Sequence, residues 1–388
     1  MILIMQVVFI ISGFIIFWAM IGYPISIKFI GKFSKNSNFK DFSHVPTVTV
    51  MVVAHNEEKV IENKLKNLLS LNYPKEKLKF LIASDNSTDL TNEITKKFIL
   101  NNKEIKIKLF EVSERKGKTN AQNEAHKLVD TDFLVMTDAN SILDKNCIKE
   151  LMASFSSENI AYVSGRLILE NSVETKVSNA ESTYWDSDLY IREIEGSLHS
   201  ITAGNGALYA CRTKDYIDLD PIHCHDSAMP PIYTMQGKRA IANHDAIAVE
   251  KAGEVIEDEF KRKVRMNRIL LKFILPDIKI LNVFKYKWFS YFYFGHRTCR
   301  YLLWISHLTL LLSNMYLSIY SIFIYKIILA VHLCFYLISY IGYKMRIENK
   351  IVTLCYYYTV TILAQWVGVY NTITGNSKPF WEKAESTR

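Results

Sequence analysis

Short apolar runs alternate with amphipathic stretches through the first half of the chain. The runs are rich in β-branched residues and each stops at a polar turn, which is typical of buried strands. We expect strands at 47–54, 79–84, 105–112 and 133–136. The stretches between them place apolar residues at helical spacing, and we expect helices at 57–71, 91–100 and 117–129. This alternation predicts a mostly parallel sheet covered by helices.

Much longer apolar stretches occupy the two ends of the chain. Residues 1–27 contain no charged side chain, and about 20 apolar residues suffice to cross the hydrocarbon core of a bilayer. No basic segment precedes this run and no small-residue cleavage site follows it, which favours an uncleaved anchor over a signal peptide. Residues 301–343 predict two further spans and residues 351–373 a third. A re-entrant last segment is the alternative, because the tail after it is basic.

These patterns predict four regions. They are an N-terminal transmembrane anchor at 1–30, a cytoplasmic α/β domain at 31–269, an interfacial amphipathic segment at 270–300, and C-terminal transmembrane helices with a tail at 301–388. The third region is too charged to span and should lie among lipid headgroups. Lys28, Lys32 and Lys35 follow the first apolar run and should hold the α/β domain on the cytoplasmic side of the plasma (inner) membrane.

Composition narrows the classes of protein and partner. The net charge is +8, but the basic residues are spread along the chain, so membrane lipid is a better partner than nucleic acid. The six cysteines include no C-x-x-C pair, which argues against a zinc site and against a disulfide framework. No G-x-G-x-x-G or P-loop motif follows a predicted strand, so neither of these nucleotide sites is indicated.

Two of the predicted strands are followed by an acid, Asp85 in one case and Asp138 in the other. Ligands of open α/β sheets bind at the carboxyl ends of parallel strands, where a carboxylate can hold a divalent cation or a ribose hydroxyl. The alternative is that each aspartate caps the next helix. A basic loop with a glycine, residues 113–118, lies between the two strands and suits either a phosphate ligand or an ordinary solvated turn.

Several ordered segments of this sequence resemble the family 2 glycosyltransferases, in particular their membrane-bound, polysaccharide-synthase-like members. The segments are VVAHNEE at 52–58, ASDNSTD at 83–89, RKGKTNAQNEA at 115–125, TDAN at 137–140, AGNGALYACR at 203–212, CHDSAMP at 224–230 and EFKRKVRMNR at 259–268. The resemblance covers most of residues 45–270. It implies a Rossmann-like α/β GT-A domain, a nucleotide-sugar donor, Mg²⁺ or Mn²⁺ as cofactor, and inversion at the anomeric carbon.

The resemblance also implies roles for individual residues. Those expected to bind the donor are Asn56, Glu57, Asp85, Lys118, Asp138, Arg265 and Arg268. The cation should lie on Asp138 and Asn140, and Asp226 should act as the catalytic base. The acceptor should contact Trp185, Gly204, Asn205 and Gly206. Each assignment has a plainer alternative: Asp226 caps a helix at 227–236, Trp185 packs in a core, the glycines form a bulge, and the arginines lie on a basic membrane-surface helix.

Three positions depart from the family pattern. Asn140 replaces the second acid of the DxD motif, His225 precedes Asp226 where the family has a second acid, and Ile269 stands where processive synthases carry tryptophan. We therefore expect transfer from a UDP-sugar to a growing cell-surface polysaccharide or lipid-linked glycan, with assembly or export proteins as possible partners, and processivity stays open. The alternatives are single-sugar transfer to a polyprenyl phosphate and a silent nucleotide-sugar-binding scaffold of an export complex.

Overall fold

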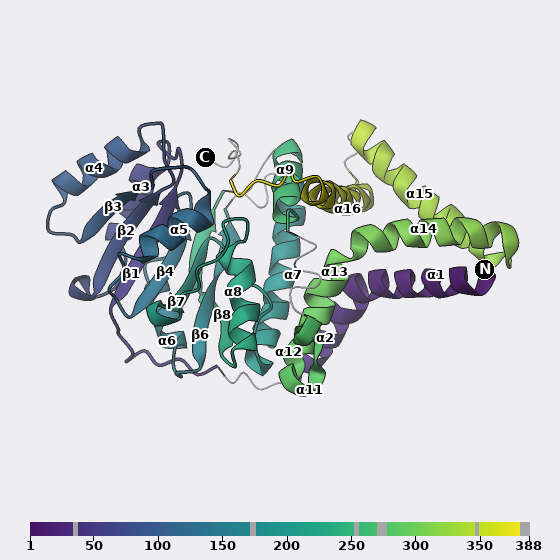
Figure 1. The fold of residues 1–388 in the computed structure, drawn as a ribbon, viewed down its shortest axis with the longest axis horizontal. Helices are drawn as coiled ribbons and strands as arrows, with labels where there is room; N and C mark the ends of the chain where they lie inside the picture. Colours follow the sequence, from purple (N-terminus) through teal and green to yellow (C-terminus); the bar gives the residue numbers. More distant parts are fainter. Residues whose placement is uncertain (34–37, 171–175, 252–255, 270–277, 346–348, 381–388) are drawn as a thin grey trace. The chain divides into compact units, whose positions relative to one another are not determined.

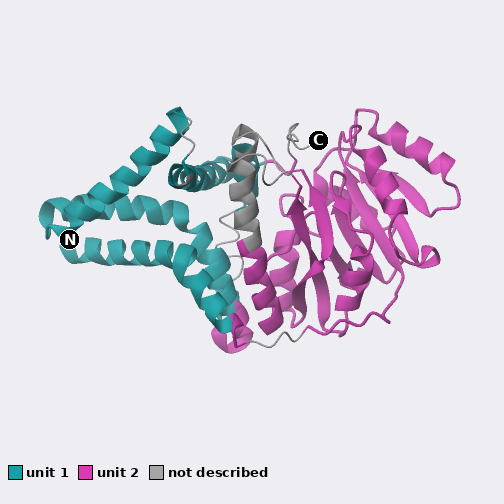
Figure 2. Cartoon of the chain, turned by 180° about the vertical axis from the view of Figure 1, so that it is seen from behind, with its two compact units in different colours: residues 1–30, 255–282, 290–377 teal, residues 31–254, 283–289, 378–388 magenta. Residues whose placement is uncertain are grey.

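The structure is a computed structural model that describes residues 1–33, 38–170, 176–251, 256–269, 278–345 and 349–380. The chain divides into two compact units, which Figure 2 colours separately. The first unit comprises residues 1–30, 255–282 and 290–377. The second comprises residues 31–254, 283–289 and 378–388.

The second unit is built on one eight-stranded sheet flanked by helices (Figure 1). Its strands are β1 (Val48–Ala54), β2 (Leu78–Ser84), β3 (Ile107–Glu111), β4 (Phe133–Asp138), β5 (Ile142–Leu143), β6 (Ile160–Leu169), β7 (Leu208–Arg212) and β8 (Arg239–Glu250). Its longer helices are α3 (Ile61–Leu69), α4 (Thr91–Asn101), α5 (Lys118–His126), α6 (Cys147–Ser154), α7 (Lys176–Leu198) and α8 (His225–Met235).

The sheet has a parallel half and a mixed half. The strand order is β3-β2-β1-β4-β7-β6-β8-β5. The first four strands in this order run parallel, which confirms the predicted Rossmann-like alternation. Strand β7 is antiparallel to both β4 and β6, whereas β6 and β8 are parallel. The predicted strands and helices of the first half all appear, with ends that differ by a few residues.

Burial of both faces explains why the central strands are continuous apolar runs. Every residue of β1 is buried. Successive side chains of a strand point to opposite faces, and accordingly Val50 and Val52 join one core cluster while Met51 and Val53 join the other. A strand with helices on both faces needs no polar side, so the pattern loses the alternation that marks a half-buried strand.

The register of the parallel strands gathers their carboxyl ends at one edge of the sheet. Ala54 at the end of β1 lies beside Ser84 at the end of β2, and Val53 lies beside Asp138. After the first two strands the backbone turns through an asparagine in the left-handed region, Asn56 with φ 53° and Asn86 with φ 52°. Asparagine tolerates this conformation better than most residues. Both turns therefore lie at the same edge of the sheet as Asp138.

The first unit is helical. Its longer helices are α1 (Ile2–Phe17), α2 (Tyr23–Gly31), α9 (Ile256–Met266), α14 (Leu303–Tyr320), α15 (Ile324–Met345) and α16 (Lys350–Ile373). Helical segments at 2–31, 324–345 and 351–373 are long and apolar enough to cross a membrane. A bent pair at 288–301 and 303–320, with a 62° angle between its parts, qualifies as a broken span or a re-entrant loop.

Candidate active site

A lysine and an aspartate meet at the end of β4. Lys118, the first residue of α5, points its Nζ at Oδ1 of Asp138 and donates to the carbonyl oxygen of Gly206 at 3.2 Å. Burial alone would lower the pKa of Lys118, but the charges of Asp138 and Asp226 outweigh it and raise the pKa above its usual value. The lysine is therefore a cation at neutral pH.

Asp226 belongs to the same cluster. A Cβ atom added to Gly206 would lie 3.6 Å from Nζ of Lys118 and 3.7 Å from Oδ2 of Asp226, so both charged groups lie close to this glycine. The backbone N–H of Gly204 donates to the carbonyl oxygen of Asp226 at 2.6 Å. The structure thus brings Lys118, Asp138, Asp226 and the loop at 204–206 together, as the family resemblance implies.

The position of Asp226 in its helix does not match the capping alternative. Helix α8 begins at His225, its N-cap residue is Cys224, and no side chain makes a cap hydrogen bond there. Asp226 lies in the first turn, where the helix dipole stabilises a carboxylate. His225 is buried, with its ring nitrogens 2.9 Å from Oε1 of Gln122 and 3.2 Å from the carbonyl oxygen of Ile217. Burial lowers the pKa of His225 to about 3, which suits a packing role.

Asp85 organises the basic loop before α5. Its two carboxylate oxygens accept the backbone N–H groups of Lys116 at 3.2 Å and Gly117 at 3.0 Å. Gly117 has φ +97°, and a Cβ there would lie 2.5 Å from the carbonyl oxygen of Pro379, so a side chain is excluded. An ionised carboxylate has about four acceptor positions, so Asp85 can still accept an N–H from a nucleotide base.

Asn56 and Glu57 join the turns after β1 and β2. The amide oxygen of Asn56 accepts the backbone N–H of Thr88 at 2.7 Å, and its amide nitrogen donates to Oγ1 of Thr88 at 3.2 Å. The backbone N–H of Glu57 donates to Oγ1 of Thr91 at 2.7 Å. The two turns are therefore cross-linked into one surface beside Asp85.

The cluster offers oxygen ligands for a divalent cation. Asn140 follows Asp138 by two residues and is half-buried. Among the residues that the structure describes, no group of three His, Cys, Asp or Glu side chains could hold a metal ion. Mg²⁺ commonly uses only one or two carboxylates and takes its other ligands from substrate phosphates and water. The carboxylate of Asp138 and the amide oxygen of Asn140 fit a cation that shares the donor's diphosphate.

The positions of three predicted residues relative to this cluster are not described. The side chain of Trp185 lies outside the described residues. Arg265 and Arg268 belong to the first unit, so their contact with the donor stays a prediction.

Two residues that the sequence did not single out support the loop at 204–206. Arg192 of α7 donates to the carbonyl oxygens of Ala203 at 3.0 Å and Gly204 at 2.5 Å, and it pairs with Asp188 at 2.6 Å. Tyr162 packs its hydroxyl where a Cβ of Gly204 would be, 1.9 Å from that position. In the sequence, only the spacing of Asp188 and Arg192, four residues apart, could have indicated this ion pair. Such pairs also occur on exposed helix faces.

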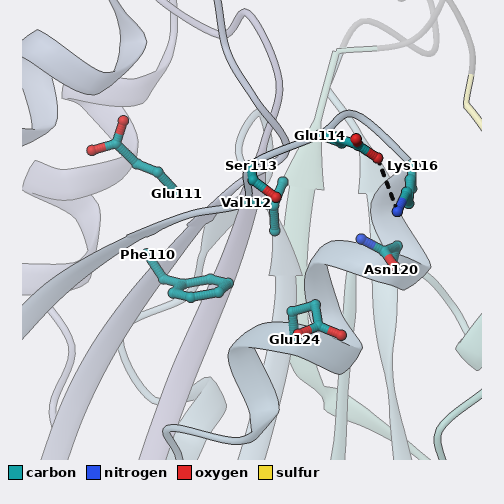
Figure 3. Close-up of a pocket in the computed structure, with 8 residues that line it drawn as sticks. All are labelled: Phe110, Glu111, Val112, Ser113, Glu114, Lys116, Asn120 and Glu124. Carbon is teal, nitrogen blue, oxygen red and sulfur yellow. Dashed lines mark ion pairs between the residues drawn. The ribbon is translucent and has the colours of Figure 1, made fainter.

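A cavity of about 410 Å³ lies beside the basic loop, between β3 and α5 (Figure 3). Its lining includes Glu111, Glu114 and Glu124, and its one lysine, Lys116, pairs with Glu114 at 3.0 Å. Glu111 and Glu124 are likewise paired, with Lys96 at 2.7 Å and with Lys127 at 2.8 Å. We therefore assign no role to this cavity.

Comparison with known proteins shows which family this chain resembles. Residues 49–214 match the family described as Glycosyl transferase family 2. The β-monoglucosyldiacylglycerol synthase of Nostoc sp. is 26% identical over 42% of this chain and 35% of its own length. The poly-β-1,6-N-acetyl-D-glucosamine synthase of Staphylococcus aureus is 31% identical over 34% of this chain and 32% of its own length. The match spans about a third of the length of these relatives.

A solved structure extends the comparison of fold to nearly the whole chain. The mannosyltransferase of Pyrobaculum calidifontis, in complex with GDP-Man and Mn²⁺, superposes with a TM-score of 0.74 at 18% identity. The superposition covers 95% of this chain and 99% of that one. The predicted GT-A fold is thereby confirmed. Residues 49–214 are thus similar to glycosyl transferase family 2.

Proposed function

We propose that this protein is a membrane-bound inverting glycosyltransferase that transfers a sugar from a nucleoside diphosphate donor to a growing glycan or a lipid-linked acceptor. One observation carries the proposal. Lys118 and Asp226 approach the same point beside Gly206, at the end of the strand that carries Asp138. Lys118, Asp138 and Gly206 lie within the segment that matches glycosyl transferase family 2, and Asp226 follows it. A cation and a candidate base close to one point suit the leaving group and the nucleophile of a transfer reaction.

The proposed chemistry follows from these positions. Asp226 accepts the proton of the acceptor hydroxyl as its oxygen forms a bond to the anomeric carbon. The bond from that carbon to the diphosphate breaks on the opposite face, which inverts the configuration. Lys118 stabilises the negative charge that develops on the diphosphate. A cation held by Asp138 and Asn140 would supply Lewis-acid stabilisation of the phosphoryl oxygens.

The comparisons guide which donors and acceptors should be tested. We expect a UDP-sugar, although the solved mannosyltransferase was bound to GDP-Man with Mn²⁺, so both bases belong in the test. One relative is named for a glycolipid product and another for a polysaccharide. Helices able to span a membrane would bring the domain to the surface where both kinds of acceptor occur. We place the domain on the cytoplasmic side, with Arg265 and Arg268 facing the donor.

Release of nucleoside diphosphate from a panel of UDP- and GDP-sugars tests the proposal. The purified full-length chain would be incubated with each donor in Mg²⁺, in Mn²⁺ and in EDTA, with a lipid extract or short glycans as acceptor. We expect one donor to be consumed and EDTA to stop the release. Tight binding of a donor without release under any condition would favour the scaffold alternative, which the neutral Asn140 motivates.

A further inference from the structure

A lysine lies in the core beneath the predicted cation site. Helix α3 buries Ile61, Leu65 and Leu68 against the sheet, and Lys64 lies on the same side of the helix with 0% of its surface exposed. Lysine is almost never fully buried without a partner. The position therefore calls for a reason beyond packing.

The ammonium group of Lys64 reaches the turn after β4. Its Nζ donates to Oγ1 of Thr137 at 3.0 Å and to the carbonyl oxygen of Ser141 at 2.5 Å. These two acceptors flank the segment that carries Asp138 and Asn140, one on each side. Both acceptors are neutral, so the charge is not there to complete an ion pair with them.

Other contacts fix the surroundings of this turn. Asn67, one helical turn after Lys64, makes two hydrogen bonds of 2.8 Å to the backbone of Leu143. The hydroxyl of Ser141 donates to Glu250 at the end of β8. In addition to these groups, Lys64 contacts the turn from helix α3. A helix that needed only to pack here could use an apolar side chain.

The environment of Lys64 opposes its charge. Burial lowers the pKa of Lys64 to about 7, against the charges of Asp138 and Glu250, which act in the other direction. Replacing a whole buried ion pair by apolar residues is often neutral or stabilising, whereas removing one partner alone leaves the buried groups that it contacted unsatisfied. A lysine nevertheless occupies this position, where α3 meets the turn that carries Asp138.

We propose that Lys64 is a positioning residue of the donor site, which holds the turn from Thr137 to Ser141 in the shape that Asp138 and Asn140 need to share a cation with the donor's diphosphate. This inference rests on the proposed function. Residues that orient metal ligands from behind commonly change metal affinity or activity 10- to 100-fold when they are replaced.

Lys64→Met tests the proposal, because methionine has a similar length and no charge. Mn²⁺ affinity would be measured by electron paramagnetic resonance on the full-length protein saturated with UDP or GDP. We expect Mn²⁺ to bind roughly 10- to 100-fold more weakly. Melting temperature is measured to check that the variant folds, and nucleotide affinity in EDTA should not change. Lys66→Met is the matched control, since Lys66 is exposed on the same helix and pairs with Glu62, and it should bind Mn²⁺ like the wild type.

Unchanged or tighter Mn²⁺ binding in a folded Lys64→Met protein would overturn the proposal, because the turn would then not depend on the ammonium group. Lys64→Gln is the second variant if methionine prevents folding. Glutamine keeps a hydrogen-bond donor but is shorter, and we expect a loss of Mn²⁺ affinity here too. Failure of the wild type to bind Mn²⁺ with either nucleotide would overturn the proposed function as well, whereas normal wild-type binding that Lys64→Met leaves intact overturns this inference alone.

Discussion

The two halves of the candidate site are supported by different kinds of interaction. The turns after β1 and β2 are held by amide, hydroxyl and backbone groups, as in the bonds between Asn56 and Thr88. The turn after β4 and the loop at 204–206 are held by the charged groups of Lys64, Lys118 and Arg192. The charged supports of the first half are carboxylates rather than cations: Asp85 accepts backbone N–H groups of the basic loop, Asp89 accepts that of Glu58, and Glu58 accepts that of Leu90.

This difference matches what each half must do in a transfer reaction. A nucleoside needs a surface of fixed shape with a few hydrogen-bonding groups. A leaving diphosphate and an attacking hydroxyl change their charge during the reaction, and preorganised charges are the strongest way to stabilise that change. We therefore expect changes in the first half to alter donor affinity alone, and changes in the second half to alter turnover or cation dependence.

The largest effect is expected from Asp226→Asn. Asparagine preserves the shape but cannot accept the proton, so kcat should fall by ~10²–10⁴ while donor affinity changes little. Calorimetry and transfer rate on one protein sample measure both quantities. Asp218→Asn, an exposed residue of the preceding loop, is the control. Full activity of Asp226→Asn would eliminate the residue as the base, and a cation-dependent loss of affinity would make it a metal ligand instead.

The next effect concerns Asp138→Asn, which removes the predicted cation ligand and the partner of Lys118. Donor affinity in Mn²⁺ should fall roughly 10- to 100-fold, with a much smaller loss in EDTA. Calorimetric titration of the donor under both conditions separates the two cases. Asp144→Asn, exposed after β5, serves as control. Equal losses with and without the cation would rule out a metal-ligand role.

Asp85→Asn should give a smaller and cation-independent effect. An amide has one oxygen, and its NH₂ group would face a backbone N–H of Lys116 or Gly117. Leaving one such group unsatisfied costs about 1–3 kcal/mol, so we expect donor affinity to fall about tenfold. The loss should be the same in Mn²⁺ and in EDTA. A loss of donor affinity that occurs only in Mn²⁺ would show that the first half of the site also takes part in cation binding, and would contradict the proposed difference between the halves.

The smallest effect is a pH dependence of stability. Below about pH 7 the folded protein carries a buried ammonium on Lys64. Above it the folded state is neutral there while the unfolded chain still binds a proton up to about pH 10.4, so wild-type stability rises with pH. The melting temperature of Lys64→Met relative to wild type should therefore be higher at about pH 6 than at about pH 9. A difference that does not vary with pH would contradict the lowered pKa.

The sequence predicted the parallel half of the sheet because its strands and helices follow one another locally. The antiparallel placement of β7 between β4 and β6 was not predicted. Its partners are distant in the sequence, and nothing in a strand's own residues identifies them. For the same reason the pairing of β6 with β8 becomes visible only in the structure.

The site divides in a similar way. The gathering of Asp138, Lys118 and Asp226 was implied by ordered motifs that resemble a known family. Lys64 and Arg192 were missed because a lysine on a helix and an acid–base pair four residues apart are typical of solvated surfaces. Only burial against a particular turn or loop distinguishes them, and burial is a property of the folded chain.

The stereochemistry of transfer tests the central claim most directly. The donor identified in the panel, with its sugar in the α configuration, would be incubated with acceptor and Mn²⁺, and the anomeric protons of the first product would be followed by NMR. Our account predicts that nucleoside diphosphate release is matched by a β-linked product, because we propose that Asp226 activates the acceptor for direct displacement while Lys118, close to the same point beside Gly206, stabilises the leaving diphosphate. An α-linked first product, formed at the same rate, would contradict direct displacement at this site.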